Sequence, residues 1–361
     1  MRIDRRLLQN VDWFLVGTTL AMVALGLTTL ANLSAEQDAP IVWRQAVWVG
    51  LGLLAFVLVA SVDYRGLIGA APAFYVAGIS LLLTVFVVGH TVSGAQRWIL
   101  VGPISVQPAE IFKLIFILTL VWALTSRWAR PRSWGTVILA LGLLAVPFLL
   151  IVGQPDLGSG AILFPVLLAL LVGAGVRLRE LGWLSLAGLA VTPLAWWLLK
   201  DYQRERILVY LNQFGDPQGG AYHVIQSKIA IGSGQLFGKG IVEATQSRLA
   251  FLPERHTDFI FAAFAEMWGF VGCLALVIGY GLLFLRGFDI AASARDPGGR
   301  LAALGVTALL ATQTLANMGM ATGLLPVVGL PLPLMSYGGS SMVVTLAALG
   351  LLLSVRMRQF D

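Results

Sequence analysis

Long apolar runs separated by short polar breaks dominate the pattern of this 361-residue chain. A helix that crosses a bilayer needs about 20 mostly apolar residues, because each residue adds about 1.5 Å to a path of about 30 Å through hydrocarbon. Ten runs approach this length, over residues 13–33, 42–61, 67–88, 108–125, 135–152, 159–175, 181–199, 258–285, 301–321 and 337–355. The pattern predicts an all-α integral membrane protein with about ten transmembrane helices.

The composition predicts a single polytopic membrane domain over residues 1–361, with no soluble appendage. Only 12% of the residues are charged, 58% are hydrophobic, and the mean hydropathy is +0.85. A soluble domain carries about 25% charged residues, so this chain has too few charges to cover a water-facing surface. The run 13–33 is too long for the apolar part of a signal peptide, which predicts a retained first helix.

The loop arginines predict the orientation in the cytoplasmic (inner) membrane. Cytoplasmic loops carry an excess of Lys and Arg, and alternate breaks of this chain hold most of the arginines. These are Arg2, Arg5, Arg6, Arg65, Arg127, Arg130, Arg132, Arg177, Arg179, Arg286, Arg295, Arg300, Arg356 and Arg358. Both termini are therefore predicted to be cytoplasmic. The net charge of +6 is explained by this orientation and not by binding to nucleic acid.

Segment 200–256 is predicted to be a long extracytoplasmic loop between the seventh and eighth spans. Its basic residues suit a lipid diphosphate, or they simply contact lipid headgroups. The spacing of Ile207, Leu208 and Leu211 predicts a short amphipathic helix in the membrane interface. The glycines of 232–240 could allow close approach of backbone to a ligand, or they could mark ordinary turns.

Ionisable side chains are rare in the apolar runs, and such residues point to function. Glu110 and Lys113 share one face at the start of the fourth run, Asp258 opens the eighth run, and Glu266 lies deeper. The orientation places Glu110, Lys113 and Asp258 at the external boundary, where they could form one site. Equally, Asp258 could be an N-cap, and Glu110 and Lys113 could be a structural ion pair.

A proline-rich segment, Gly323–Ser341, interrupts the last part of the chain. It contains Pro326, Pro331 and Pro333, which preclude one regular helix. Non-helical backbone at membrane depth is tolerated only where it is buried in protein or lines a cavity. The segment is therefore predicted to dip back and help to form a site.

Five strings in this order resemble the SEDS family (shape, elongation, division and sporulation). They are Gly94-Ala-Gln-Arg-Trp-Ile99, Gln107-Pro-Ala-Glu110 with Lys113, Gln154-Pro-Asp-Leu-Gly158, Leu252-Pro-Glu-Arg-His-Thr-Asp-Phe-Ile-Phe261 and Pro331-Leu-Pro-Leu-Met-Ser-Tyr-Gly-Gly-Ser-Ser341. Two departures are visible, because the family usually has Ser at Ala109 and Glu-Glu at Glu266-Met267. The second departure puts a role for a second carboxylate in doubt.

The resemblance implies a peptidoglycan glycosyltransferase with ten spans that polymerises lipid II at the outer face of the membrane. It implies a class B penicillin-binding transpeptidase as partner, and the family's essential aspartate matches Asp258. The context Val327–Pro333 is more similar to the members that act with the elongation machinery in rod shape than to the division-specific members, which stay a possible assignment. The same spans could also belong to a lipid II flippase, or to a scaffold that activates the transpeptidase.

The chemistry of the predicted reaction gives each candidate residue a role. Asp258 is the predicted general base for the attacking sugar hydroxyl, with inversion at the anomeric carbon. The departing diphosphate needs cations, for which the candidates are Lys113 and Arg97, then Lys239, Arg248 and Arg255. Glu110 would hold Lys113 or help to bind a divalent cation, Mg²⁺ or Mn²⁺. A flippase would instead place its ionisable groups near the membrane midplane.

Overall fold

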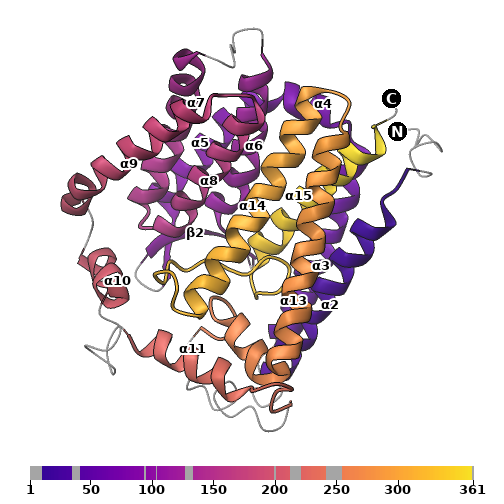
Figure 1. Ribbon diagram of the computed structural model, residues 1–361, viewed down its shortest axis with the longest axis vertical. Coiled ribbons are helices and arrows are strands. Elements are labelled where there is room, and N and C mark those ends of the chain that lie inside the picture. The colour runs from indigo at the N-terminus through magenta and orange to yellow at the C-terminus, as the bar shows by residue number, and fades with distance from the viewer. Residues whose placement is uncertain are drawn as a thin grey trace.

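The computed structural model describes residues 10–34, 41–92, 95–102, 104–126, 133–198, 201–211, 221–240 and 254–359. Helices account for most of these residues (Figure 1). Their bounds are α2 (Trp13–Ser34), α3 (Ile41–Ser61), α4 (Tyr64–Gly69), α5 (Ala71–Val88), α6 (Pro108–Thr125), α7 (Trp134–Gly153), α8 (Leu157–Gly173), α9 (Leu178–Leu198), α10 (Asp201–Leu211), α11 (Tyr222–Ser233), α13 (Ile260–Ser293), α14 (Pro297–Ala321) and α15 (Gly339–Met357).

The predicted membrane character is confirmed. Among the described helices, eight are long and apolar enough to cross a membrane: α2, α3, α5, α6, α7, α13, α14 and α15. The 17-residue α8 and the 21-residue α9 occupy the sixth and seventh predicted runs. The third run is divided into α4 and α5 at Ala70, which is followed by a proline in the first turn of α5. The count of ten spans stays a prediction.

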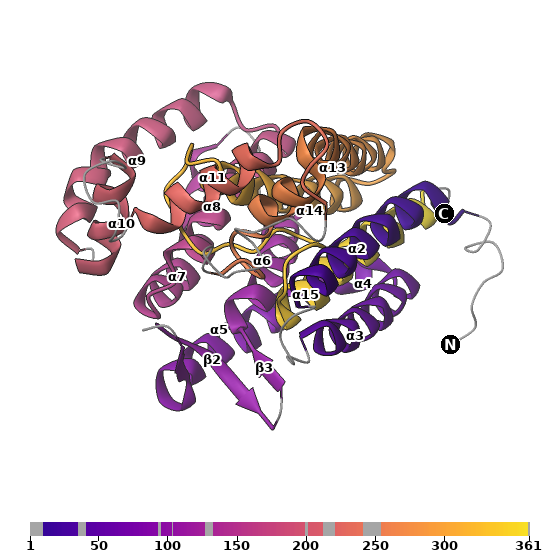
Figure 2. The same cartoon turned by 90° about the horizontal axis from the view of Figure 1, so that it is seen from below.

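The core of the bundle is formed by α6, α14 and α15. Within the apolar 18-residue stretch of each helix, 78% of α15 and 72% of α6 is buried inside the protein. The same share is only 22% in each of α3, α5 and α13. Viewed from below, α2 and α3 lie on one side of this core, whereas α9 and α10 lie on the opposite side (Figure 2). The start of α2 and the end of α15 lie at one end of the bundle, opposite α11 (Figure 1).

A small antiparallel sheet, which the apolar runs did not predict, lies between α5 and α6. Its strands are β1 (His90–Val92), β2 (Ala95–Val101) and β3 (Ile104–Val106), in the order β1-β2-β3. Ile99 pairs with Val106 and His90 pairs with Trp98. The sheet stands at the edge of the bundle next to α5 (Figure 2), and it holds Arg97 on its central strand.

Segment 200–256 contains two helices in its described part. A helix is present there as α10, and α11 follows it; the amphipathic placement of α10 in the membrane interface stays a prediction. Tyr210 of α10 donates a hydrogen bond from its hydroxyl to the carbonyl of Leu324 at 2.9 Å. Ser227 of α11 donates from its hydroxyl to the carbonyl of Ala321 at 2.6 Å. Both helices are therefore held against the end of α14 and the segment that follows it.

The segment that contains the glycines of 232–240 packs against α13 where that helix is broken. Gly269 has non-helical φ and ψ of 63° and −164°, so the helix loses backbone hydrogen bonds there. Lys239 N donates to the Glu266 carbonyl at 3.0 Å, and Phe270 N donates to the Gln235 carbonyl at 2.8 Å. The segment after α11 thus satisfies the backbone groups that the break exposes. Its glycines pack against protein backbone, and their approach to a ligand stays a prediction.

Gly238 and Gly240 offer a matched pair of substitutions at this break. Gly238 has φ +79°, and an added Cβ would lie 2.1 Å from the Met267 carbonyl oxygen; Gly240 has φ +69° and open space. We expect Gly240→Ala to cost about 1–2 kcal/mol through left-handed strain alone, and Gly238→Ala to cost clearly more. Thermal unfolding in detergent measures both variants, and equal losses would show that close packing at Gly238 contributes nothing.

Candidate active site

Asp258 lies in the turn that leads into α13, and it does not cap the helix. The N-cap of α13 is Phe259, which makes no side-chain cap hydrogen bond. The turn is closed by Phe259 N, which donates to the Glu254 carbonyl at 3.2 Å. Asn317 of α14 donates from its amide to the backbone carbonyls of Asp258 at 2.9 Å and Leu330 at 2.7 Å. The backbone of Asp258 is therefore fixed, and the cap interpretation of its carboxylate is wrong.

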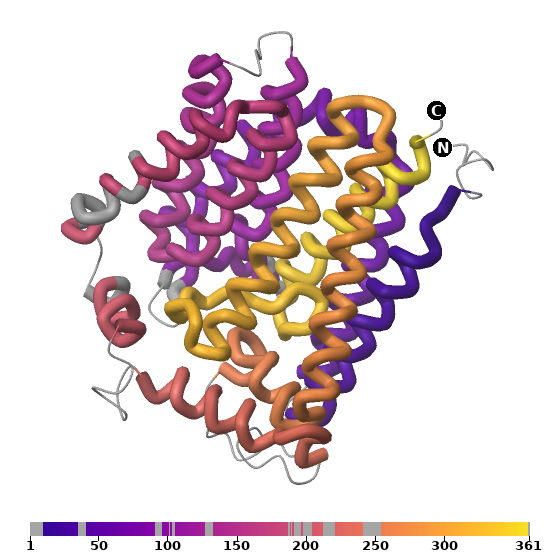
Figure 3. Tube along the Cα trace, in the orientation of Figure 1, coloured from indigo at the N-terminus to yellow at the C-terminus, as the bar shows by residue number. Residues whose placement is uncertain are grey.

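The proline-rich segment between α14 and α15 forms one wall beside Asp258. The Cα trace doubles back here near the start of α13 (Figure 3). Tyr337 N donates to the His256 carbonyl at 2.8 Å, and the Ser336 hydroxyl donates to the Thr257 carbonyl at 2.6 Å. A Cβ added at Gly329, where φ is +71°, would lie 3.5 Å from Asp258 Oδ2. The re-entrant backbone predicted from the prolines therefore reaches the carboxylate itself.

Two arginines from distant parts of the chain act on the Asp258 carboxylate. Burial and the neighbouring Glu254 carboxylate raise the pKa of Asp258 to about 6, Arg97 and Arg206 oppose this rise, and Asp156 adds to it. Arg206 of α10 also donates from Nη1 to the Val327 carbonyl at 3.3 Å. Among the described residues the Asp258 carboxylate has no hydrogen-bond partner. The carboxylate therefore lies in the electrostatic field of two cations.

Asp156 organises the arginine on the sheet. It caps α8 by accepting from Ser159 N at 3.1 Å, and it accepts from the Gln107 side-chain amide at 2.7 Å. Arg97 Nη1 lies 4.0 Å from its Oδ1. The string Gln154–Gly158 therefore places a carboxylate within 4.0 Å of Arg97, and Asp156 is a site residue that sequence reasoning did not assign.

Glu110 and Lys113 form a buried ion pair on α6. Lys113 Nζ lies 2.6 Å from Glu110 Oε1, and the side chains are only 1% and 4% exposed. Neither is among the groups that act most on Asp258. This burial favours a structural role for the pair, and contact of Lys113 with substrate stays a prediction.

Of the remaining predicted cations, Lys239 and Arg255 are described, and neither is among the groups that act most on the pKa of Asp258. Lys239 lies 3.5 Å from Glu266 Oε1 at the break in α13. Arg255 is buried, and its Nε lies 3.4 Å from His256 Nε2; burial and the Arg255 charge lower the pKa of His256 to about 4, so this ring is neutral. Arg248 lies outside the described residues.

The described residues offer no group of three or more His, Cys, Asp or Glu side chains arranged to hold a metal ion. Mg²⁺ is commonly held by one or two carboxylates together with substrate phosphates. The divalent cation, Mg²⁺ or Mn²⁺, therefore stays a prediction.

Comparison with known proteins places the chain in a family. The family of cell cycle proteins that includes FtsW, RodA and SpoVE matches residues 7–360. The peptidoglycan glycosyltransferase MrdB of Escherichia coli (strain K12) is 41% identical over 342 residues, which are 93% of this chain and 92% of that protein.

Solved structures agree with this placement. A chain of a peptidoglycan synthase complex that coordinates polymerization and crosslinking is similar with a TM-score of 0.82 and 37% identity, over 97% of this chain and 99% of that one. The rod shape determining protein RodA of Thermus thermophilus is similar with a TM-score of 0.74 and 35% identity, over 97% and 98% of the two chains. This protein belongs to the FtsW, RodA and SpoVE family of cell cycle proteins.

Proposed function

We infer that this protein is a peptidoglycan glycosyltransferase that polymerises lipid II into glycan strands at the outer face of the cytoplasmic membrane. The observation that carries the assignment is the Asp258 carboxylate, whose pKa is raised to about 6 and which lies in the field of Arg97 and Arg206 beside the backbone of the proline-rich segment. MrdB is described as a peptidoglycan glycosyltransferase, and the similarity covers the whole site.

Asp258 is the proposed general base. It takes the proton from the acceptor sugar hydroxyl as the hydroxyl oxygen attacks the anomeric carbon of the lipid-linked donor. The bond from that carbon to the diphosphate oxygen breaks, and its electron pair leaves with the lipid diphosphate. A single base on the face opposite the leaving group inverts the anomeric centre. A pKa of about 6 makes this carboxylate more basic than an ordinary one, yet mostly ionised at pH 7.

Arg97 and Arg206 are the proposed partners of the diphosphate. A guanidinium presents several donors that match phosphate geometry, and its charge offsets the charge that develops on the leaving group. Arg97 is held near Asp156, and Arg206 is held by the Val327 carbonyl. Lys239, Arg248 and Arg255 stay weaker proposals for contacts with the substrate.

The setting of the reaction is proposed from the same comparisons. The similarity to a chain of a peptidoglycan synthase complex supports a class B penicillin-binding protein as partner. The similarity to a rod shape determining protein supports a role in elongation rather than division. Both chain termini are proposed to be cytoplasmic, since the start of α2 and the end of α15 share one end of the bundle (Figure 1).

The pH dependence of lipid II polymerisation by the purified protein tests this assignment. We expect the rate to rise with pH through about 6, the pKa of Asp258, and then to level off, because only the ionised carboxylate accepts a proton. Well below that pH the rate should fall about tenfold per pH unit. The rate is measured as labelled polymer on a gel, with and without a class B transpeptidase.

Arg206→Gln sharpens this test. Arg206 lowers the pKa of Asp258, so its removal should move the midpoint to higher pH in addition to slowing the reaction. The control is Arg300→Gln, which changes an exposed arginine at the start of α14 and should leave the midpoint unchanged.

A flat profile of polymerisation rate between pH 5 and 8 would remove Asp258 from the base role. Transport of lipid II across liposomes without any polymer would favour a flippase.

A further inference from the structure

A small pocket of about 240 Å³ is lined by residues that are not part of the active site. Its lining residues are Trp134, Arg177, Arg179, Glu180 and Trp183. Trp134 begins α7, whereas the others come from the turn before α9 and its first turns. Both helices begin at the end of the bundle that holds the start of α2 and the end of α15 (Figure 1), so the pocket opens at the membrane boundary opposite α11.

The walls of the pocket carry chemistry typical of a membrane interface. Trp134 is 50% exposed and Trp183 is 53% exposed, and tryptophan is enriched where headgroups meet hydrocarbon. Arg177 and Arg179 are exposed at the same mouth. Two guanidinium groups and two indole rings at the membrane interface suit a phosphate-bearing headgroup.

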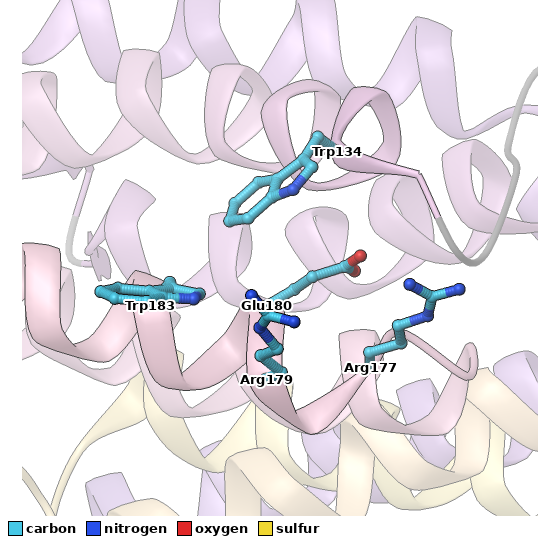
Figure 4. Close-up of a pocket in the computed structure, with 5 residues that line it drawn as sticks. All are labelled: Trp134, Arg177, Arg179, Glu180 and Trp183. Carbon is cyan, nitrogen blue, oxygen red and sulfur yellow. The ribbon is translucent and has the colours of Figure 1, made fainter.

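Glu180 distinguishes this pocket from a simple anion site. The residue is only 6% exposed, and its Oε2 atom has no hydrogen-bond partner. Its carboxylate points between the Trp134 ring and the Arg177 guanidinium (Figure 4). Neither pocket arginine forms an ion pair with it within 4.0 Å in the described part of the chain. A buried carboxylate oxygen without a donor costs free energy, and it marks a position where a ligand can supply an N–H group.

We propose that this pocket binds the headgroup of a phospholipid that carries both a phosphate and a primary ammonium, namely phosphatidylethanolamine. The phosphate would lie between Arg177 and Arg179, and the ammonium would donate to Glu180 Oε2 against the indole faces. Phosphatidylglycerol has no cation for Glu180. Phosphatidylcholine has a cation but no N–H to donate, so it leaves the same oxygen unsatisfied.

The surface beside the pocket suits the acyl chains of such a lipid. Ile138 on α7 is 65% exposed, and Leu186 on α9 is 54% exposed. Ile138 lies about one turn after Trp134 on α7, and Leu186 lies about one turn after Trp183 on α9. A headgroup in the pocket would therefore continue into apolar surface that already faces hydrocarbon.

Native mass spectrometry of the delipidated protein in detergent tests the proposal. Phosphatidylethanolamine, phosphatidylglycerol and phosphatidylcholine with the same acyl chains are added in equal amounts, and the first bound lipid is counted. We expect phosphatidylethanolamine to be preferred about tenfold, since one hydrogen bond to a buried charge has about that effect. Glu180→Gln should remove the preference, and soluble phosphoethanolamine should compete with the lipid.

Other variants separate the pocket from general lipid adhesion. Arg177→Gln should weaken phosphatidylethanolamine and phosphatidylglycerol alike, whereas Arg300→Gln should change neither. Trp183→Leu leaves every charge in place and should lower the preference for phosphatidylethanolamine. If Glu180→Gln does not fold, the Trp183→Leu variant tests the proposal in its place. Equal binding of the three lipids by the wild-type protein, or an unchanged preference in folded Glu180→Gln and Trp183→Leu, would overturn the proposal.

Discussion

Asp258→Asn is expected to abolish lipid II polymerisation while the protein still inserts, folds and binds its substrate. Asparagine has the same shape as aspartate but cannot accept the proton of a sugar hydroxyl. Loss of a general base costs about 10²–10⁴-fold in rate. The fold should tolerate the change, because Asp258 is held by its backbone carbonyl through Asn317 and its carboxylate caps no helix.

A second aspartate provides the control for this prediction. Asp296 caps α14 by accepting from Gly299 N at 3.0 Å, and it lies at the opposite end of that helix from Asn317. Asp296→Asn should keep polymerisation near the wild-type rate. Binding of lipid II to Asp258→Asn should persist, since removing a negative charge does not weaken attraction for a diphosphate. Near wild-type polymerisation by Asp258→Asn would refute the base assignment.

The helices could be predicted because the bilayer imposes both a length and a composition on them. The run 108–125 coincides with α6, and the run 301–321 falls within α14. The break at Gly269 could not be predicted, since its hydrogen-bond partners come from 235–240, a segment separate in sequence. The β-sheet was missed because its strands are short and follow an apolar helix without a clear alternation of polar and apolar residues.

The candidate site was only partly visible in the sequence. The motifs identified Asp258 and Arg97, because unusual polar strings stand out in an apolar chain. Arg206 was only one of the basic residues of segment 200–256, and its approach to Asp258 depends on how α10 folds against the Val327 backbone. Membrane depth predicted Lys113 near Asp258, which stays a prediction, whereas its burial beside Glu110 depends on the rotation of α6 about its axis, which depth alone does not determine.

Lys113→Met is expected to destabilise the protein by about 3–5 kcal/mol, because it leaves the buried Glu110 carboxylate without its cation. The ammonium and carboxylate are 2.6 Å apart, and their side chains are almost fully buried. Thermal unfolding in detergent measures the loss. Arg65→Met is the matched control: Arg65 pairs with Asp296 at 3.6 Å, but their side chains are 44% and 32% exposed. Such a surface pair contributes at most about 1 kcal/mol.

The double variant Glu110→Gln with Lys113→Met then separates stability from chemistry. It removes both charges, so most of the lost stability should return, because a neutral amide is far less costly to bury than an unpaired carboxylate. If the pair only fixes the first turns of α6, polymerisation returns with stability, which is the outcome that the burial of Lys113 favours. A double variant that unfolds at the wild-type temperature and yet makes no polymer would contradict this, and would make the Lys113 ammonium a contact for the lipid diphosphate.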